Sequence, residues 1–185
     1  MTNRLFISAD IPDEIKDKVI EFRDNIYGSN NNVKWENKTK LHFTLKFLGD
    51  VEDNKIKSIQ IILEDLLKEL SPIKCAFGKF GLFKRNEMPS VLWLGIKFNK
   101  ELIQLSELIN NSLEKIGFEK EKRKFKPHLT LIRLKGNENL EKINGFLDFD
   151  LPETKFEINE ISLMKSELLS SGSFYNKIKS FKLNK

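Results

Sequence analysis

The two histidines of this chain occupy the same short motif. His42 lies in Leu41-His-Phe-Thr-Leu45, and His128 lies in Pro127-His-Leu-Thr-Leu131, almost half the chain further on. Imidazole has an unperturbed pKa of about 6.5, so it can accept or donate a proton near neutral pH. If the two rings meet on opposite sides of a phosphorus atom, one could activate the attacking water or hydroxyl and the other could protonate the leaving oxygen. The repeated motif therefore predicts acid–base chemistry on a phosphate ester.

The motif also predicts what surrounds each imidazole. Side chains two residues apart in a strand share a face, so Thr44 would lie beside His42 and Thr130 beside His128. The apolar residues of the motif would then face the core. Threonine hydroxyls and nearby cations can hold the non-bridging oxygens of a phosphate, whose charge persists through the reaction. We therefore expect a site that needs neither a metal ion nor another cofactor.

The positive charge of the chain is concentrated around these motifs. The formal net charge is +5, from 32 Lys and Arg and 27 Asp and Glu. Two segments, residues 33–46 and 120–135, are rich in lysine and arginine, and each contains one histidine. A single lysine-rich segment is usually a solvated face. Two such segments, each around a histidine, instead indicate an anionic partner.

Composition indicates the class of protein and its compartment. A chain of 185 residues with 39% hydrophobic residues can bury one substantial core, so we expect one domain. The longest apolar stretches, such as Val91-Leu-Trp-Leu-Gly95, fall far short of the about 20 residues of a membrane span. Cys75 is the only cysteine, which excludes an intrachain disulfide and a zinc site of cysteines and histidines. We expect no secretory signal, no membrane contact and a cytoplasmic location.

Hydrophobic periodicity predicts a mixture of helices and strands. Helices are expected from Pro12-Asp13 onward and over residues 53–70, 100–116 and 139–146, the third of these capped by Asn99. Strands are expected over residues 4–9, 33–35, 41–48, 74–80, 90–98, 128–134, 156–166 and 174–183. Loops are expected around Arg85 and Pro89 and over residues 169–173. Because helices and strands alternate irregularly, an antiparallel or mixed sheet fits better than a doubly wound parallel one.

The repeat predicts how the two motifs are arranged. If an approximate two-fold axis relates the two halves of the chain, the strand of His42 would face the strand of His128 across a groove. Two imidazoles and two hydroxyls would then surround one point, which is the arrangement that an in-line displacement requires.

These residues resemble the paired H-x-T-x motifs of the two-histidine (2H) phosphoesterase superfamily. The landmarks around them are similar to those of its bacterial and archaeal branch, RNA 2′,3′-cyclic phosphodiesterase, also called 2′-5′ RNA ligase. In chain order these landmarks are Arg4-Leu-Phe-Ile-Ser-Ala9, Leu41-His-Phe-Thr-Leu-Lys-Phe-Leu-Gly49, Val91-Leu-Trp-Leu-Gly95, Phe125-Lys-Pro-His-Leu-Thr-Leu131 and Ser166-Glu-Leu168. The resemblance covers nearly the whole chain.

The resemblance implies an α+β fold in which two pseudo-symmetric lobes, with antiparallel or mixed sheets, flank a central cleft within one bilobal domain over residues 1–185. It also implies hydrolysis of a terminal RNA 2′,3′-cyclic phosphate to a 2′-phosphate, with reversible 2′-5′ joining of RNA ends. By position, His42 would be the general acid and His128 the general base. Thr44, Thr130 and Arg133 would bind the phosphate.

Other basic residues are expected to contact the RNA, namely Arg123, Lys126 and Arg85. Lys126 stands where relatives often have arginine, so it keeps the charge and loses the bidentate geometry. Arg133 can contact the same phosphate as His128 only if the strand departs from regular alternation. In a strictly alternating strand it would lie on the face opposite His128, so a bulge or the end of the strand must redirect it.

Other interpretations stay open. The same site could act on a cyclic phosphate of ADP-ribose or on a 2′-5′ oligoadenylate, and the acid and base roles could exchange. The chain could also be a non-catalytic RNA-binding module that uses the same basic segments. Trp35 and Phe125 could stack on bases or pack in the core, and Phe6 is expected to be buried packing. We expect a monomer.

Overall fold

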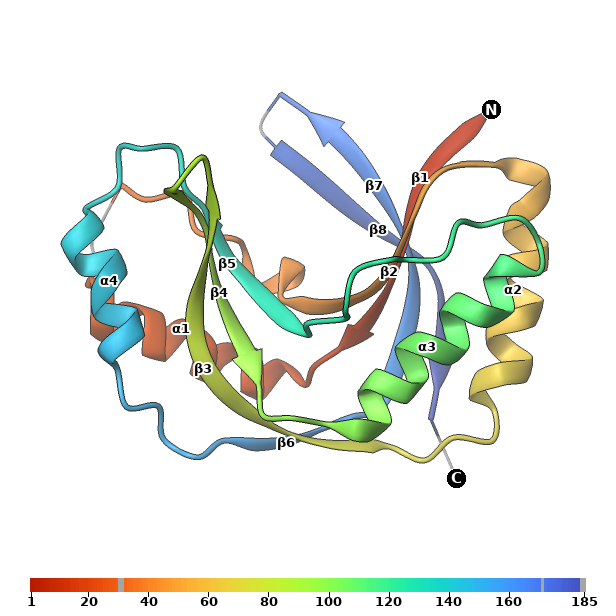
Figure 1. Cartoon of the computed structure of the whole chain (residues 1–185), viewed down its shortest axis with the longest axis horizontal. Helices are drawn as coiled ribbons and strands as arrows, with labels where there is room; N and C mark the ends of the chain where they lie inside the picture. The colour runs from red at the N-terminus through yellow and green to blue at the C-terminus, as the bar shows by residue number, and fades with distance from the viewer. Residues whose placement is uncertain (30–31, 171, 184–185) are drawn as a thin grey trace.

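The computed structural model describes residues 1–29, 32–170 and 172–183, which form four α-helices and two four-stranded antiparallel sheets (Figure 1). The first sheet has the strand order β2-β1-β7-β8, with β1 (Thr2–Asp10), β2 (His42–Glu52), β7 (Glu160–Leu169) and β8 (Gly172–Lys182). The second has the order β5-β4-β3-β6, with β3 (Ile73–Arg85), β4 (Met88–Ile96), β5 (His128–Arg133) and β6 (Lys155–Ile158). The predicted α+β class with antiparallel sheets is confirmed.

The helices cover the two sheets in pairs. Their bounds are α1 (Asp13–Tyr27), α2 (Asp53–Leu67), α3 (Lys100–Glu114) and α4 (Leu140–Asp148). Helices α2 and α3 pack together against the first sheet, whereas α4 packs on β3 of the second sheet and on α1 (Figure 1). The predicted cap is confirmed, because the Asn99 side chain accepts a hydrogen bond from the Leu102 backbone at 2.8 Å. No helix within the described ranges is long and apolar enough to span a bilayer.

The repeat in the sequence corresponds to a repeat in the order of the elements. The series strand, helix, strand, helix, strand runs from β1 to β3 and again from β4 to β6. Helix α1 follows β1 of the first sheet and packs with α4 beside the second, and α3 follows β4 of the second sheet and packs on β2 of the first. Each half of the chain therefore has elements that pack against both sheets. In each sheet the strand that begins with a histidine is an edge strand.

The core lies behind the two histidine strands. Phe43 and Leu45 of β2 and Leu129 and Leu131 of β5 are buried, as the alternation within the motif predicts. Full burial of one such side chain stabilises the fold by about 1.5–3 kcal/mol. Burial of these apolar residues therefore holds the histidine face of each strand outward.

Two predicted strands are wrong. Residues 33–35 do not form a strand; the Trp35 backbone N–H donates to the Val33 carbonyl at 3.0 Å, so this segment turns locally. The segment 156–166 is not one strand either. It divides at Asn159 into β6 of the second sheet and β7 of the first. The apolar pattern of this segment correctly indicates that both parts are buried. The prediction of one strand was wrong because such a pattern does not indicate which sheet buries each part.

Two predicted loops are shorter than expected. β3 extends to Arg85 and β4 begins at Met88, so only Asn86 and Glu87 form the turn, both with positive φ (50° and 62°). Positive φ at both central residues is the geometry of a two-residue hairpin. In the predicted loop 169–173, Leu169 belongs to β7 and Gly172 begins β8. Position 171 lies outside the described residues.

Candidate functional site

The two histidine strands meet at the boundary between the sheets. Strand β2 contacts β5, and the Glu36 backbone N–H, in the segment that leads into β2, donates to the Leu131 carbonyl of β5 at 2.8 Å. The rings lie close enough that the charge of His128 contributes to lowering the pKa of His42. The structure thus brings together the two imidazoles that the repeated motif singles out, each from the edge of its own sheet.

Each imidazole is anchored by the backbone two residues before it. His128 Nδ1 lies 2.6 Å from the Lys126 carbonyl oxygen. Because a carbonyl only accepts, Nδ1 carries the hydrogen, and in the neutral ring Nε2 is the free acceptor. His42 has the matching hydrogen bond to the backbone of Lys40, which acts to raise its pKa. The two rings are therefore held in the same way on the two strands.

Aromatic rings fix the orientation of His42. Phe6 of β1 stacks on the imidazole with a centroid distance of 5.1 Å, and Tyr175 of β8 meets it edge-on at 5.6 Å. Phe6 is only 3% exposed, so its predicted packing role is confirmed. Tyr175 was not identified from the sequence. Only the pairing of β8 with β7 and of β7 with β1 brings it to the histidine.

His128 has an equivalent frame on the second sheet. Phe83 of β3 meets the imidazole edge-on at 4.9 Å, and Trp93 of β4 lies 6.1 Å away. Gly81 permits this packing, because a Cβ at that position would collide with the Trp93 ring. Trp93 lies in one of the landmark segments, Val91-Leu-Trp-Leu-Gly95, whereas nothing local in the sequence identifies Phe83.

Burial makes both histidines weaker bases. It is the main cause that lowers the pKa of His42 from 6.5 to about 4, and it also lowers the pKa of His128. Nearby charges act differently on the two rings. The Asp10 carboxylate raises the pKa of His42, whereas the Arg133 guanidinium lowers that of His128. Without a bound anion, both rings are therefore neutral at pH 7.

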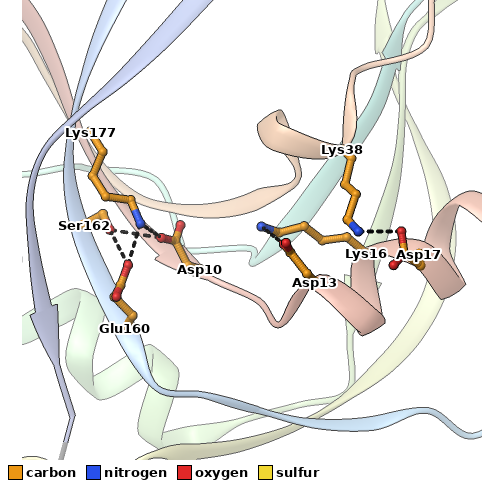
Figure 2. A network of polar contacts seen from close by, with 8 residues as sticks. All are labelled: Asp10, Asp13, Lys16, Asp17, Lys38, Glu160, Ser162 and Lys177. Atoms are coloured by element: carbon orange, nitrogen blue, oxygen red, sulfur yellow. Dashed lines mark hydrogen bonds and ion pairs between the residues drawn. The ribbon is translucent and has the colours of Figure 1, made fainter.

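Asp10 is held by a polar network with Ser162 and Lys177 (Figure 2). Asp10 pairs with His42 across β1 and β2, and its Oδ2 accepts hydrogen bonds from Ser162 Oγ at 3.0 Å and Lys177 Nζ at 2.9 Å. Lys177 also pairs with Glu160 at 2.5 Å. These hydrogen bonds hold the carboxylate of Asp10 in place. No sequence pattern identified Asp10, because its partners are far away along the chain.

A second unpredicted charge near His42 is Lys16 on α1, whose ammonium contributes to lowering the pKa of that ring. Its Nζ donates to Asp13 at 3.0 Å, within the same turn of the helix (Figure 2). The side chain is 15% exposed, so this cation is partly enclosed near the histidine. Its position makes it a candidate contact for an anionic substrate.

The bulge that Arg133 requires is present. Thr130 pairs with Trp93 across β5 and β4, whereas Arg133 pairs with Val91, so three steps along β5 correspond to two along β4. One extra residue on β5 shifts the alternation of side chains. Arg133 therefore lies on the same face as Thr130 and His128. Its effect on the pKa of His128 is consistent with this position.

The remaining predicted RNA contacts, Lys126, Arg123 and Arg85, have exposed side chains. Lys126 is anchored through its carbonyl to His128, and its side chain is exposed. Arg123 is exposed on the same connection, where its backbone N–H donates to Glu121 at 3.1 Å. Arg85 lies at the tip of the β3–β4 hairpin, and its side chain forms no ion pair with another described residue.

The two aromatic residues with alternative interpretations pack against the protein. Trp35 lies between Tyr27, at 5.2 Å, and Phe146, at 5.9 Å, with the Arg23 guanidinium over its ring. Phe125 is partly buried against the core. The packing interpretation therefore fits both residues. Within the described ranges, no three His, Cys, Asp or Glu side chains gather into a group that could hold a metal ion.

Comparisons with known proteins show the family to which the chain belongs. The family model described as the 2′-5′ RNA ligase superfamily matches residues 11–168. A relative from Methanocaldococcus jannaschii, named RNA 2′,3′-cyclic phosphodiesterase, is 36% identical over 95% of this chain and 98% of its own. A relative of the same name from Methanothermobacter thermautotrophicus is 30% identical over 99% of this chain and 100% of its own.

Solved structures share the fold. A crystal structure of a phosphoesterase superposes with a TM-score of 0.79 at 24% identity and covers 100% of both chains. E. coli LigT complexed with 3′-AMP superposes with a TM-score of 0.78, also at 24% identity and over 100% of both chains. The architecture of two sheets and four helices is therefore shared at low sequence identity.

Proposed function

The chain belongs to the 2′-5′ RNA ligase superfamily of 2H phosphoesterases, and from this premise we propose that it hydrolyses the 2′,3′-cyclic phosphate at the end of an RNA. Its relatives carry the name of that activity. The observation that carries the proposal is the paired anchoring of His42 and His128 on neighbouring edge strands. That arrangement supports two proton transfers at one phosphorus atom.

The reaction is an in-line displacement. Neutral His128 takes a proton from water through Nε2, and the water oxygen forms a bond to phosphorus as the bond from phosphorus to O3′ breaks. Protonated His42 delivers its proton to O3′. The products are a 2′-phosphate and a free 3′-hydroxyl. When the 5′-hydroxyl of a second RNA replaces water, the same steps join the ends through a 2′-5′ linkage.

Local charges support this division of roles. Asp10 stabilises the protonated form of His42, and a bound phosphate would add a second negative charge beside that ring. Arg133 favours the neutral form of His128, which a general base requires. The negative charge of the substrate would thus raise the pKa of His42 and favour the protonated form that a general acid requires.

The phosphate is held by groups that need no metal ion. Thr44 and Thr130 lie beside the histidines, and Arg133 faces the same side through the bulge. Each proton transfer typically contributes a factor of about 10² to 10⁴ in rate, or about 3–5 kcal/mol of barrier. The strain of the five-membered cyclic phosphate lowers the remaining barrier.

The proposed enzyme works as one bilobal domain over residues 1–185 and as a monomer, because both histidine strands come from one chain. The lysines and arginines of residues 120–126, with Arg85 further out, would contact the RNA. The unpaired thiol of Cys75 and an RNA substrate favour the cytoplasm as its location.

The test uses an oligoribonucleotide that ends in a 2′,3′-cyclic phosphate, incubated with the protein in EDTA. We expect conversion to a terminal 2′-phosphate, identified by its resistance to a 3′-phosphatase and by NMR of phosphorus. Replacing either histidine, as His42→Asn or His128→Asn, should lower kcat by about 10² to 10⁴. Circular dichroism would check that each variant folds.

Three results would contradict the proposal. The first is activity that disappears in EDTA and returns with a divalent metal ion, which would exclude the metal-independent mechanism. The second is full activity in a folded double variant, His42→Asn with His128→Asn. The third is turnover of ADP-ribose cyclic phosphate with no turnover of the oligonucleotide, which would assign the site to another substrate.

A further inference from the structure

A large aromatic side chain lies exposed beside the catalytic face. Phe47 of β2 is 68% exposed and pairs with Phe6 across β1 and β2. The two rings lie 6.2 Å apart, and Phe6 in turn stacks on His42 at 5.1 Å. Phe6 therefore lies between Phe47 and His42, and the three rings form a row that leads from the surface to the catalytic imidazole.

Phe47 also lines a groove of about 420 Å³, which we name the Phe47 groove. Its lining consists of residues 47–52, Lys55 and residues 117–119. The groove is open beside Gly49 and Gly117. A Cβ added at either position would have no other atom of the protein within 4 Å. Known small-molecule sites span about 300–1,000 Å³, so the Phe47 groove could hold one nucleoside.

The segment 120–126 leads from the Phe47 groove to His128. It carries five exposed cations, Lys120, Lys122, Arg123, Lys124 and Lys126. None of these side chains forms an ion pair with another described residue. Lys46 holds the start of the segment against β2, because its buried Nζ donates to the Glu119 carbonyl and to Asn110 Oδ1, both at 2.7 Å. Figure 1 shows this connection from α3 to β5 passing β2.

Charge decides which part of a nucleotide would enter. Asp50, Glu52 and Glu119 line the groove with only Lys55 to balance them, so a phosphate there would be repelled. A base carries no charge, presents a face to the Phe47 ring, and offers N–H groups to carboxylates. The phosphates would instead follow the cations of segment 120–126.

We propose that Phe47 and its groove bind the nucleobase of the nucleotide that precedes the reacting end of a single-stranded RNA. The proposal rests on the proposed function, since it takes the terminal phosphate to lie between His42 and His128. Stacking on a single aromatic ring requires an unpaired base, because in a duplex both faces of the base are already covered. The Phe47 groove would therefore select single-stranded ends.

The experiment compares two substrates across four proteins. The substrates are a mononucleotide 2′,3′-cyclic phosphate, which has no preceding base, and a short single-stranded oligoribonucleotide with the same terminus. The proteins are the wild type, Phe47→Ala, Phe47→Trp and Phe98→Ala. Phe98 is the matched control, because it is 86% exposed and lines a different hollow, beside Cys75 and Phe156.

Phe47→Ala should raise KM for the oligonucleotide about tenfold, because stacking of one base is lost, and should leave kcat and the mononucleotide KM within a factor of about two. Phe47→Trp should restore the oligonucleotide KM. Phe98→Ala should change neither. An equal effect of Phe47→Ala on both substrates would overturn the proposal, since Phe47 would then act only by supporting Phe6 and His42. An unchanged oligonucleotide KM would also overturn it.

Binding separates this inference from the proposed function. Fluorescence anisotropy with a labelled single-stranded RNA bearing a 3′-phosphate measures affinity without turnover, so it remains valid if the wild type hydrolyses neither substrate. About tenfold weaker binding in Phe47→Ala, reversed in Phe47→Trp, supports the Phe47 groove. Equal binding by the two variants and the wild type refutes it. A blunt duplex with the same end should bind more weakly than the single strand.

Discussion

His42 and His128 lie in environments that lower the pKa of both rings and favour their neutral forms. Burial is the largest influence on the pKa of both rings, because it disfavours the charged imidazolium. At His42, burial lowers the pKa by more than the Asp10 carboxylate raises it. A cyclic phosphate carries one negative charge, which favours the protonated form of the nearer ring. The free protein and its substrate complex should therefore have different proton affinities at this site.

We predict that the pH profile differs between kcat/KM and kcat. The profile of kcat/KM reports the free protein, in which both pKa values lie below 6.5, so its maximum should fall on the acidic side of pH 6.5. In the complex, the phosphate raises the pKa of the acid, and the alkaline limb of kcat should lie about one pH unit or more higher. Superimposable profiles would contradict the idea that substrate charges the acid.

Replacing Asp10 tests the assignment of the acid. Asp10→Asn removes the negative charge that raises the pKa of His42, so the pKa falls and the alkaline limb of kcat should move down by up to about one pH unit. The acidic limb should move less. Asp65→Asn, an equal charge change on α2, is the control and should shift neither limb. If neither limb moved, Asp10 would not control the pKa of His42.

At the scale of elements, the site depends on how strands β3, β4 and β5 lie against each other. The aromatic frame of His128 comes from β3 and β4, and Gly81 of β3 gives the Trp93 ring its space. The bulge in β5 places Arg133 on the histidine face. Small backbone features of the sheet thus determine which side chains lie on the face of His128.

We predict that Gly81→Ala damages both stability and activity. The new methyl group would collide with the Trp93 ring, and overpacking of this kind typically costs about 1–3 kcal/mol of the free energy of unfolding. Displacement of Trp93 would also disturb the orientation of His128, so kcat should fall. Urea denaturation and steady-state kinetics measure the two effects.

Gly145→Ala is the matched control for that substitution. Gly145 lies within α4, and a Cβ there would meet Ile26 at 3.9 Å, an ordinary contact distance. Alanine in a helix interior is favoured over glycine by about 1 kcal/mol, so this variant should be slightly more stable and fully active. If both variants behaved alike, the contact between Gly81 and Trp93 would not explain the first result.

At the scale of the whole molecule, the distribution of charge should govern how RNA binds. The net charge is only +5, yet five exposed cations lie within residues 120–126 on the connection between the Phe47 groove and His128. Exposed charges of this kind attract phosphates at long range, and salt screens them. The affinity for an oligonucleotide should therefore depend on salt much more than the affinity for a mononucleotide.

We predict that a triple variant, Lys120→Gln, Lys122→Gln and Lys124→Gln, reduces this salt dependence. The slope of log affinity against log salt is about −0.7 for each phosphate neutralised in a single strand, so its magnitude should decrease by up to about 2. Anisotropy titrations between 50 and 300 mM salt would measure the slope, a range chosen around the about 150 mM of physiological conditions.

An equal loss of charge elsewhere is the control for the salt experiment. Lys18, Lys57 and Lys182 are exposed on α1, α2 and β8, and their replacement by glutamine lowers the net charge by the same amount. This control should keep the wild-type slope. If both triple variants lost slope equally, net charge and not the segment 120–126 would attract the RNA.

The sequence by itself determined the family resemblance, the candidate histidines and the local face of the strands that carry them. The repeated motif identified His42 and His128, and the alternation within it separated Thr44 and Thr130 from the buried Phe43 and Leu129. Caps and apolar stripes located the helices, for example α3 behind Asn99. These features could be predicted because they depend on spacing within a few residues, where the geometry of a helix or strand is fixed.

Only the tertiary structure decided which elements meet. It placed Tyr175 and Asp10 beside His42, divided residues 156–166 between two sheets, and turned Arg133 to the face of His128 through a bulge. It also left Phe47 exposed one ring away from the site. The physical reason is that an apolar pattern specifies which face of a strand is buried, whereas its partner is selected by packing and hydrogen bonding between segments far apart in the chain.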